Sequence, residues 1–293
     1  MWQTIRENIA DSIGEPFVIE STHSVGGGSI NSAYVIKGDQ HSYFVKTNSA
    51  TRLSMFEAES AGLQEIAASN TIKVPQPLCV GTSAGSAYIV MEYLAINAGR
   101  SGSSGSIDQL GIDLAAMHRI THAQFGWHRD NTIGSTPQVN DRLNSWIDFY
   151  REHRLGYQYQ LAAKNGYRNL LRRGEMLMSA LNQFFTDYQP QASLLHGDLW
   201  SGNYAIDDSG QPVIFDPAVY FGDREADIAM TELFGGFSPR FYSAYNDAFP
   251  LDSGYNTRKT LYNLYHILNH LNLFGAGYSG QAEHMTEQLL SEI

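Results

Sequence analysis

Hydrophobic and polar positions in the first third of the chain predict mainly short strands. Runs of β-branched and aromatic residues, each bounded by turn residues, predict strands at residues 17–20, 33–37, 43–47 and 87–91. Apolar residues recur at helical spacing in residues 2–13 and 54–69. We therefore expect this part to form a small antiparallel sheet with one long helix following its first three strands.

The rest of the chain has the apolar spacing of helices. That periodicity covers residues 107–120, 140–154, 167–188, 224–248 and 256–274. Strand signals are few there, mainly at residues 193–195 and 212–215. Residues 97–106 are small, polar and rich in Gly and Ser, which is typical of a linker. We predict an α+β protein of two lobes, a sheet-containing lobe at 1–95 and a mainly helical lobe at 96–293.

Composition and charge exclude several classes of function. The 293 residues carry a formal net charge of −11, and no cluster of Lys and Arg offers the basic surface that nucleic acids require. The N-terminus lacks the apolar core of a signal peptide, and no apolar stretch approaches the ~20 residues of a membrane span. The one cysteine, Cys79, excludes an internal disulfide. We expect a cytoplasmic monomer that binds neither nucleic acid nor membrane.

Three polar residues in the second part have the spacing of a phosphoryl-transfer site. Asp198 follows His196 and Gly197, and Asn203 comes five residues after Asp198. Asp216 comes eighteen residues after Asp198, directly behind an apolar strand. Phosphoryl transfer requires one carboxylate that accepts the hydroxyl proton, and an amide and a carboxylate that hold Mg²⁺. A hairpin that turns at residues 207–210 would bring the three groups together.

The first part carries groups that suit the phosphates of ATP. A Gly-rich stretch between two predicted strands permits close backbone approach to phosphate, and its candidate residues are Gly27, Gly28, Ser29, Ile30 and Asn31. Lys46 lies on the next predicted strand among apolar neighbours, where it would pair with the α- and β-phosphates. A carboxylate should orient this lysine. The packing face of helix 54–69 favours Glu59, with Glu57 as the alternative.

Several other residues have competing interpretations. A strand end before the lobe boundary offers backbone groups to an adenine edge, from Met91, Glu92, Tyr93 and Leu94. We expect Trp200 to line the substrate pocket, because it lies inside the proposed catalytic loop. Trp127 and residues 130–138 could border the substrate or brace the second lobe. Asp227 is expected to cap a helix or anchor the catalytic loop. His266 and His270 favour packing over metal binding.

The order of these motifs resembles the protein-kinase-like fold in the branch that contains aminoglycoside and choline kinases. More specifically, the chain resembles the fructosamine kinase, or ketosamine 3-kinase, family from about residue 20 to the C-terminus. Besides the Gly-rich stretch and the run from His196 to Asn203, the resemblance rests on residues 125–127, 130–138, 216–220, 222–227, 232–237 and 262–266.

This resemblance implies an ATP-dependent kinase that phosphorylates the 3-hydroxyl of ketosamines, the adducts of sugars with amines, and so promotes deglycation. It implies that Asp198 is the base, that Asn203 and Asp216 hold Mg²⁺, that Lys46 holds phosphates and that Glu92 to Leu94 contact adenine. Some family members have a redox-active cysteine in the Gly-rich loop, but this chain has Val25 and Ser29. The alternatives are a kinase for an aminoglycoside, choline or a simple sugar, or a non-catalytic nucleotide-binding protein.

Overall fold

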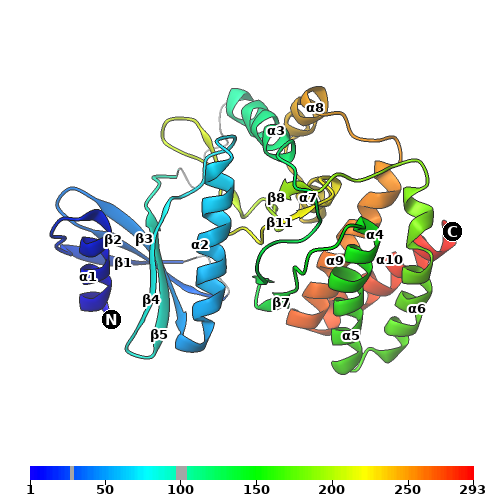
Figure 1. The fold of residues 1–293 in the computed structure, drawn as a ribbon, viewed down its shortest axis with the longest axis horizontal. Helices are drawn as coiled ribbons and strands as arrows, with labels where there is room; N and C mark the ends of the chain where they lie inside the picture. The colour runs from blue at the N-terminus through cyan, green and yellow to red at the C-terminus, as the bar shows by residue number, and fades with distance from the viewer. Residues whose placement is uncertain (27–29, 97–103) are drawn as a thin grey trace. The chain divides into compact units, whose positions relative to one another are not determined.

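The computed structural model describes residues 1–26, 30–96 and 104–293, and the chain divides into two compact units (Figure 1). The first unit contains Met1–Ser106 and Tyr204–Pro217, and the second contains Ile107–Asn203 and Ala218–Ile293. Residues 204–217 thus belong to the first unit although they follow 97 residues of the second. The lobe boundary predicted before residue 97 stays a prediction, because residues 97–103 lie outside the described residues.

The first unit is built on a five-stranded antiparallel sheet. In sheet order the strands are β1 (Ser21–Val25), β2 (Ser32–Lys37), β3 (Ser42–Ser49), β5 (Ser86–Glu92) and β4 (Pro77–Ser83). Helix α1 (Trp2–Ile13) precedes the sheet, and a short 3₁₀ turn (Ala50–Arg52) leads from β3 into α2 (Leu53–Ala68). The sheet lies between α1 and α2 in Figure 1. The antiparallel sheet predicted for this part is therefore present.

Alternation along the central strand β3 separates the two faces of the sheet. Tyr43 and Val45 are buried in a cluster with Ile5 and Ile9 of α1. Because successive side chains point to opposite faces of a strand, Lys46 points away from this cluster, toward α2. In the register of the sheet, Lys46 lies opposite Ala33 of β2 and Ile89 of β5. The alternation along β3 thus buries a lysine on the side of the sheet that faces α2.

One predicted strand in the first unit is wrong. Residues 17–20 have no regular structure, and β1 begins at Ser21. The chain leaves α1 through Gly14, which has φ +76°, and Phe17 then packs into the α1 cluster. Pairing with β2 begins at the last residue of this segment, where the N–H of Glu20 donates to the carbonyl oxygen of Lys37 at 2.9 Å. Phe17 is therefore buried by packing against α1 rather than by strand pairing.

The predicted hairpin at residues 207–210 is confirmed, and it belongs to the first unit. Strands β9 (Tyr204–Ile206) and β10 (Pro212–Ile214) pair antiparallel. Asp207 fixes the turn by accepting hydrogen bonds from the backbone of Ser209 and Gln211, each at 2.9 Å. Its second oxygen contacts Lys73 Nζ at 2.8 Å, and Lys73 forms a bridge with Val213. The hairpin that ends just before Asp216 is therefore held to the rest of its unit by a salt bridge.

The second unit is mainly helical, with two short pairs of strands. Its helices are α3 (Ser104–His118), α4 (Trp146–Phe149), a π-helix (Tyr150–Gly156), α5 (Tyr157–Lys164), α6 (Arg168–Ser179), a 3₁₀ helix (Leu181–Phe185), α7 (Glu225–Leu233), α8 (Pro239–Ala248), α9 (Tyr255–Phe274), a 3₁₀ turn (Ala276–Tyr278) and α10 (Ser279–Ser291). Its strands are β6 (Asn131–Ile133), β7 (Thr136–Gln138), β8 (Ser193–Leu195) and β11 (Tyr220–Gly222). Strand β6 pairs with β7, and β8 pairs with β11.

The helix predicted over residues 224–248 is two helices, α7 and α8. Gly235 and Gly236 both have positive φ values, 90° and 73°, which end the first helix. Ser238 then caps α8 by accepting a hydrogen bond from the N–H of Arg240, and Pro239 occupies the first turn. The apolar spacing continued across this break because both helices bury one face, so periodicity alone could not reveal it.

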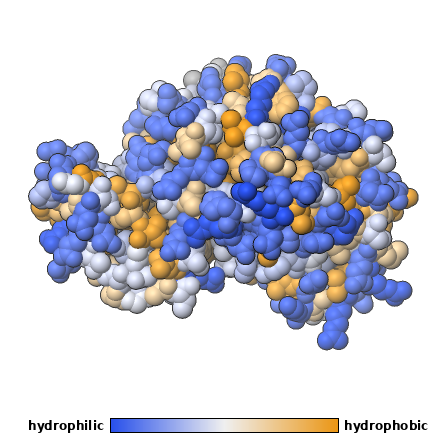
Figure 2. All heavy atoms as spheres, viewed as in Figure 1, coloured by the Kyte–Doolittle hydropathy of each residue, from blue (hydrophilic) through white to orange (hydrophobic). Residues whose placement is uncertain are grey.

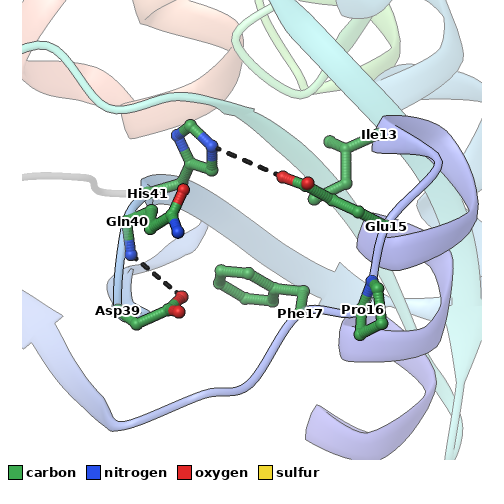
Figure 3. Close-up of a pocket in the computed structure, with 7 residues that line it drawn as sticks. All are labelled: Ile13, Glu15, Pro16, Phe17, Asp39, Gln40 and His41. Atoms are coloured by element: carbon green, nitrogen blue, oxygen red, sulfur yellow. Dashed lines mark hydrogen bonds and ion pairs between the residues drawn. The ribbon is translucent and has the colours of Figure 1, made fainter.

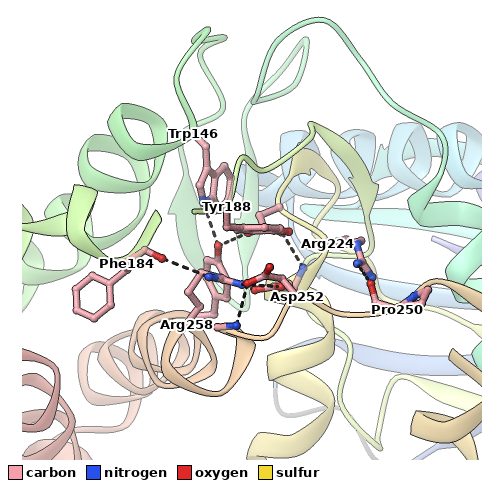
Figure 4. Close-up of polar contacts among 11 residues, drawn as sticks. Trp146, Phe184, Tyr188, Arg224, Pro250, Asp252 and Arg258 are labelled. Carbon is pink, nitrogen blue, oxygen red and sulfur yellow. Dashed lines mark hydrogen bonds and ion pairs between the residues drawn. The ribbon is translucent and has the colours of Figure 1, made fainter. Parts of the chain in front are cut away.

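A buried polar cluster joins α7, α9 and the segments beside them (Figure 4). The guanidinium of Arg258 contacts both carboxylate oxygens of Glu225, at 2.7 and 3.1 Å, and Asp252 at 2.6 Å. Asp223 accepts hydrogen bonds from the hydroxyl groups of Tyr262 and Tyr188. Because each buried charge has a partner, the cluster avoids the high cost of an isolated charge in the core.

The visible surface is neither uniformly hydrophilic nor uniformly hydrophobic. On the face shown in Figure 2, hydrophilic and hydrophobic residues are interspersed. In the described parts of the chain, none of the helices has both the length and the apolar character that crossing a membrane requires.

Candidate active site

Lys46 is the centre of a buried ion cluster in the first unit. The side chain is 8% exposed, and its Nζ lies 2.6 Å from Oε1 of Glu59 on α2. Nζ also forms an ion pair with Oδ1 of Asp216, which follows β10. Burial alone would lower the pKa of Lys46, but the carboxylates of Asp216 and Glu59 raise it above its ordinary value. The lysine therefore remains a fixed positive charge at neutral pH.

The structure distinguishes the two candidate partners of this lysine. Glu59 lies on the face of α2 that carries the buried residues Leu63 and Ile66. Glu57 is exposed. Burial raises the pKa of Glu59, and its ion pair with Lys46 opposes that effect. Glu59 is therefore the carboxylate that contacts Lys46, as the packing face of the helix predicted.

Asp216 has a backbone conformation that is rare for its residue type. Its φ is +59°, in the left-handed region that non-glycine residues seldom adopt. The side chain is 45% exposed although one of its oxygens is paired with Lys46. The turn therefore presents a partly accessible carboxylate directly beside a buried ammonium group.

The Gly-rich stretch is described only at its end, since Gly27, Gly28 and Ser29 lie outside the described residues. Ile30 and Asn31 precede β2. The side-chain amide of Asn48 on β3 donates to the carbonyl oxygen of Ile30 at 3.0 Å and to Oδ1 of Asn31 at 2.8 Å. The end of the stretch is thereby attached to the strand that carries Lys46.

The predicted adenine-binding residues follow β5. Met91 is buried within the sheet, and the N–H of Glu92 donates to the carbonyl oxygen of Gln76 at 2.8 Å. Tyr93 is 39% exposed, and Leu94 is half-buried. The N–H of Glu92 is therefore already engaged in a hydrogen bond within the first unit.

The first unit also contains a small pocket away from these residues (Figure 3). It is lined by Ile13, Glu15, Pro16, Phe17, Asp39, Gln40 and His41. His41 and Glu15 face each other across it, with 3.8 Å between Nε2 and Oε1. None of the predicted site residues lines this pocket.

In the second unit, Asp227 anchors the loop that carries Asp198. Its Oδ2 accepts from the N–H of His196 at 2.7 Å, and its Oδ1 accepts from the N–H of Gly197 at 2.8 Å. Gly197 has φ +82°, and a Cβ there would lie 2.1 Å from the carbonyl oxygen of Ala218. Only glycine fits this turn. The predicted anchoring role of Asp227 is confirmed.

A chain of hydrogen bonds holds Asp227 in turn. Arg224 Nη1 donates to the hydroxyl of Tyr245 at 3.0 Å, and that hydroxyl lies 2.8 Å from Nδ1 of His118. Nε2 of His118 lies 3.2 Å from Oδ2 of Asp227. Burial lowers the pKa of His118, so the ring is neutral at pH 7. A neutral ring that accepts from Tyr245 at Nδ1 and donates to Asp227 from Nε2 satisfies the whole chain.

The negative charge of Asp227 strengthens the hydrogen bonds that it accepts from the loop. Burial would raise its pKa, but hydrogen bonds from His118 and from the backbone of Gly197 hold the pKa below its ordinary value. The carboxylate therefore stays ionised and continues to accept from the loop. Sequence reasoning missed His118 and Tyr245. The only local signal was a histidine in the last turn of a predicted helix, which is an ordinary feature.

Asn203 closes the loop from its other end. Its Nδ2 donates to the carbonyl oxygen of Asp198 at 2.8 Å and lies 3.5 Å from Oδ2 of the same residue. Asn203 is buried, whereas the ring of Trp200 between them is 38% exposed. A Cβ on Gly202 would lie 2.3 Å from the Trp200 ring, so the indole lies directly against this glycine. Asp198, Trp200 and Asn203 therefore belong to one ordered loop.

The contacts of residues 130–138 favour the bracing role over the substrate-bordering one. Asn131 Nδ2 donates to the carbonyl oxygen of Val219 at 2.8 Å, and Gln138 Nε2 donates to that of Ala218 at 3.1 Å. The N–H of Ala218 donates to the carbonyl oxygen of His196 at 2.8 Å. The segment thus supports the backbone that lies beside the loop carrying Asp198.

The two histidines of α9 also follow the packing interpretation. His270 directs Nδ1 to the carbonyl oxygen of His266 at 2.8 Å. Burial lowers the pKa of His266 to about 3, so the ring is neutral. Across the described residues, no group of three or more His, Cys, Asp or Glu side chains could hold a metal ion.

Comparison with solved structures identifies the class of protein that this fold and site define. A choline kinase from Streptococcus pneumoniae superimposes with a TM-score of 0.65 over 99% of both chains, at 14% identity, which shows a shared fold. The chain therefore has the protein-kinase-like fold, as the motif order predicted. It belongs to the fructosamine kinase family, whose model matches residues 1–292.

The names of similar proteins agree with membership of the fructosamine kinase family. A Haemophilus somnus 129PT structure described as a fructosamine-3-kinase has a TM-score of 0.89 and 30% identity, covering 99% of this chain and 98% of that one. A Synechocystis protein assigned as a ketoamine kinase is 50% identical over 99% of this chain and 97% of its own length. An Arabidopsis thaliana protein-ribulosamine 3-kinase, chloroplastic, is 43% identical over 94% of this chain and 85% of its own length.

These findings confirm the predicted family, the fold class and the activity class. The chain is an ATP-dependent phosphotransferase of the ketosamine kinase type.

Proposed function

We propose that the chain transfers the γ-phosphoryl group of ATP to a sugar hydroxyl of a ketosamine, with Asp198 as the catalytic base. The observation that carries this proposal is the ordered loop around Asp198, whose backbone is fixed by Asp227 and Asn203. A loop held at both ends can present one carboxylate in a constant position. Such positioning is the main requirement of phosphoryl transfer.

In the reaction, the acceptor hydroxyl oxygen attacks the γ-phosphorus of ATP. A bond forms between that oxygen and phosphorus, the bond from the γ-phosphorus to the β,γ-bridging oxygen breaks, and ADP leaves. The hydroxyl proton passes to the Asp198 carboxylate. Trp200, two residues further along the loop, would lie against the sugar or its amine substituent.

Lys46 is proposed to bind the α- and β-phosphates of ATP. The carboxylates of Asp216 and Glu59 raise its pKa against the effect of burial, so it can bind the phosphates without losing its proton. The backbone of Gly27, Gly28, Ser29, Ile30 and Asn31 would cover the phosphates. Met91, Glu92, Tyr93 and Leu94 would surround adenine, with Tyr93 and Leu94 supplying the backbone contacts.

The residues present fit the magnesium ion that such a reaction uses. Asn203 donates through its Nδ2 to Asp198, so its Oδ1 is directed elsewhere, and Asp216 has a partly exposed carboxylate. Amide and carboxylate oxygens are the ligands that Mg²⁺ takes in proteins. We propose that Asn203 and Asp216 hold it. Bound there, Mg²⁺ would offset the negative charge of the phosphates.

The substrate proposed is a fructosamine or a ribulosamine, either free or on a lysine side chain. Phosphorylation at the 3-hydroxyl would make the adduct unstable, so the enzyme would remove sugars from amines. We place this activity in the cytoplasm, where metabolic sugars meet protein amines, and in a monomer. The chloroplastic name of the Arabidopsis relative applies to that protein.

A panel of acceptors tests this proposal. Purified chain would be incubated with ATP and Mg²⁺ and with ribulosyl-lysine, fructosyl-lysine, free ribose, free fructose, choline or an aminoglycoside. We expect kcat/KM to be highest for one of the two ketosamines. A higher kcat/KM for choline, an aminoglycoside or a free sugar would contradict the substrate assignment, and ATP hydrolysis with no phosphorylated acceptor would contradict the kinase activity.

A further inference from the structure

The side chain of Asn48 joins β3 to the end of the Gly-rich stretch. The paired register of β2 and β3 ends where Ser32 lies opposite Thr47. Just beyond this pair, Nδ2 of Asn48 donates to the carbonyl oxygen of Ile30 at 3.0 Å and to Oδ1 of Asn31 at 2.8 Å. A side chain thus connects the two segments at the point where backbone pairing stops. These two contacts of Asn48 are here called the amide bridge.

Every hydrogen-bonding group of the Asn48 side chain is engaged. An amide carries two N–H donors on its nitrogen and one carbonyl oxygen that accepts. The nitrogen donates to Ile30 and Asn31, and Oδ1 accepts from the N–H of Ser49 at 2.7 Å. Among side chains, only those of Asn and Gln carry an NH₂ group together with a carbonyl oxygen. The Asn48 side chain is therefore held in one orientation by contacts that few other residue types could make.

The amide bridge and Lys46 lie on the same face of β3. Side chains two residues apart on a strand point in the same direction, with about 7 Å between their positions along the strand. Lys46 is itself fixed by its ion pairs with Glu59 and Asp216. The amide bridge therefore fixes the position of Ile30 and Asn31 relative to the Lys46 ammonium group.

We propose that Asn48 is a positioning residue for ATP, whose amide holds the end of the Gly-rich stretch in register with Lys46 so that both contact the phosphates of one nucleotide. The inference rests on the proposed function, in which Lys46 and residues 27–31 bind the phosphates. Asn48 acts through Ile30 and Asn31 and does not contact ATP itself. Groups that are ordered before a ligand binds reduce the entropic cost of binding. Without the amide bridge, ATP would have to order this end of the stretch, and its affinity would fall.

Two variants remove the amide bridge from its opposite sides. Asn48→Ala deletes both hydrogen bonds, and Asn31→Ala deletes the one that Asn31 accepts while leaving β3 unchanged. Ser49→Ala is the matched control, because Ser49 is the next residue of β3, is exposed and has its hydroxyl 2.8 Å from Oγ1 of Thr51. Competition calorimetry would measure the dissociation constants of ATP, ADP and adenosine for each variant. Adenosine has no phosphate, so its affinity reports whether the rest of the nucleotide site is intact.

We expect Asn48→Ala to weaken ATP and ADP binding about tenfold and Asn31→Ala about threefold, while both bind adenosine as wild type does. The double variant should bind ATP no more weakly than Asn48→Ala, because the amide bridge is already absent from that variant. Ser49→Ala should bind all three ligands as wild type does. Wild-type ATP affinity in Asn48→Ala would overturn the proposal, as would an equal loss of ATP and adenosine or additive losses in the double variant.

Lys46→Met, measured in the same assay, separates this inference from the proposed function. Weaker ATP binding by Lys46→Met together with wild-type binding by Asn48→Ala would overturn the role of Asn48 alone. Wild-type ATP affinity in Lys46→Met would instead overturn the phosphate-binding role of Lys46 in the proposed function, and this inference with it.

Discussion

The two units of this protein hold their functional side chains in different ways. In the first unit, Lys46 is fixed by direct ion pairs with Glu59 and Asp216. In the second unit, Asp198 lies in a loop whose backbone is fixed by Asp227, a carboxylate that accepts two N–H groups. One unit positions a charge by opposing charges, and the other positions a carboxylate by hydrogen bonds to its main chain.

This difference suits the two tasks proposed. A group that binds phosphates has to keep its charge, and the neighbouring carboxylates raise the pKa of Lys46. A catalytic base has to be held in a constant position relative to the proton that it accepts. Anchoring the backbone of its loop provides such a position. Substitutions in only one of the two units test this difference between them.

The largest effect is expected for Asp198→Ala. The substitution removes the proton acceptor, so kcat should fall by about 10³-fold, within the range typical of general bases. ATP affinity, measured by calorimetry, should stay within a factor of about two, because Lys46 and its partners are unchanged. Activity close to wild type would reject Asp198 as the base.

Substitution of Lys46, the proposed phosphate-binding residue, should lower ATP affinity, which Asp198→Ala is expected to leave nearly unchanged. Lys46→Met is expected to weaken ATP binding by about 30-fold, the loss of a charge-assisted hydrogen bond. Glu59→Gln should weaken it by about fivefold because the lysine loses one orienting partner. Glu57→Gln, on the same helix but exposed, is the control and should bind ATP as wild type does. Equal effects of the two glutamate variants would contradict the assignment of Glu59.

Asp227, which anchors the loop that carries Asp198, should contribute to stability as well as activity. Asp227→Asn replaces a charged acceptor of two backbone N–H groups and should lower the free energy of unfolding by about 3 kcal/mol. Asp148→Asn is the matched control, because Asp148 is 49% exposed and pairs with Arg151 on the surface, where such pairs contribute below about 1 kcal/mol. Chemical unfolding of both variants measures the difference. Equal losses would show that Asp227 is no special anchor.

The smallest effect concerns the hairpin before Asp216 and depends on pH. Burial would raise the pKa of Asp207, but hydrogen bonds from Lys73, Ser209 and Gln211 hold it well below its ordinary value. The contribution of Asp207 to stability is therefore complete above the ordinary aspartate pKa of about 4 and is lost as pH falls below it. Asp207→Asn should be less stable than wild type by about 1 kcal/mol at pH 7, with a difference that narrows between about pH 4 and pH 2. A difference that is constant over this range would contradict the salt bridge.

Much of the fold and the chemistry could be predicted because the signals are local. The strands around Lys46, the hairpin at 207–210 and the spacing of Asp198, Asn203 and Asp216 each lie within a short window of sequence. Errors arose where tertiary packing decided the outcome. Phe17 is buried against α1 instead of starting a strand, and Gly235 and Gly236 divide a helical pattern that otherwise continues.

The unpredicted parts of the site depend on contacts between distant residues. His118 reaches Asp227 across 109 positions and Tyr245 across 127. No periodicity or spacing within one segment indicates such pairs, because each residue has an ordinary local role. Only the folded arrangement of α3, α7 and α8 brings these residues together.

The identity of the phosphorylated product tests the central claim most directly. Wild-type chain would be given ATP, Mg²⁺ and an equimolar mixture of ribulosyl-lysine, free ribose and choline, and the products would be identified by ³¹P–¹H correlation NMR. We predict one phosphate ester, coupled to the proton on carbon 3 of the ribulosyl group, and none with Asp198→Ala. Phosphate on ribose or choline, or the same ester formed by Asp198→Ala at the wild-type rate, would contradict the account.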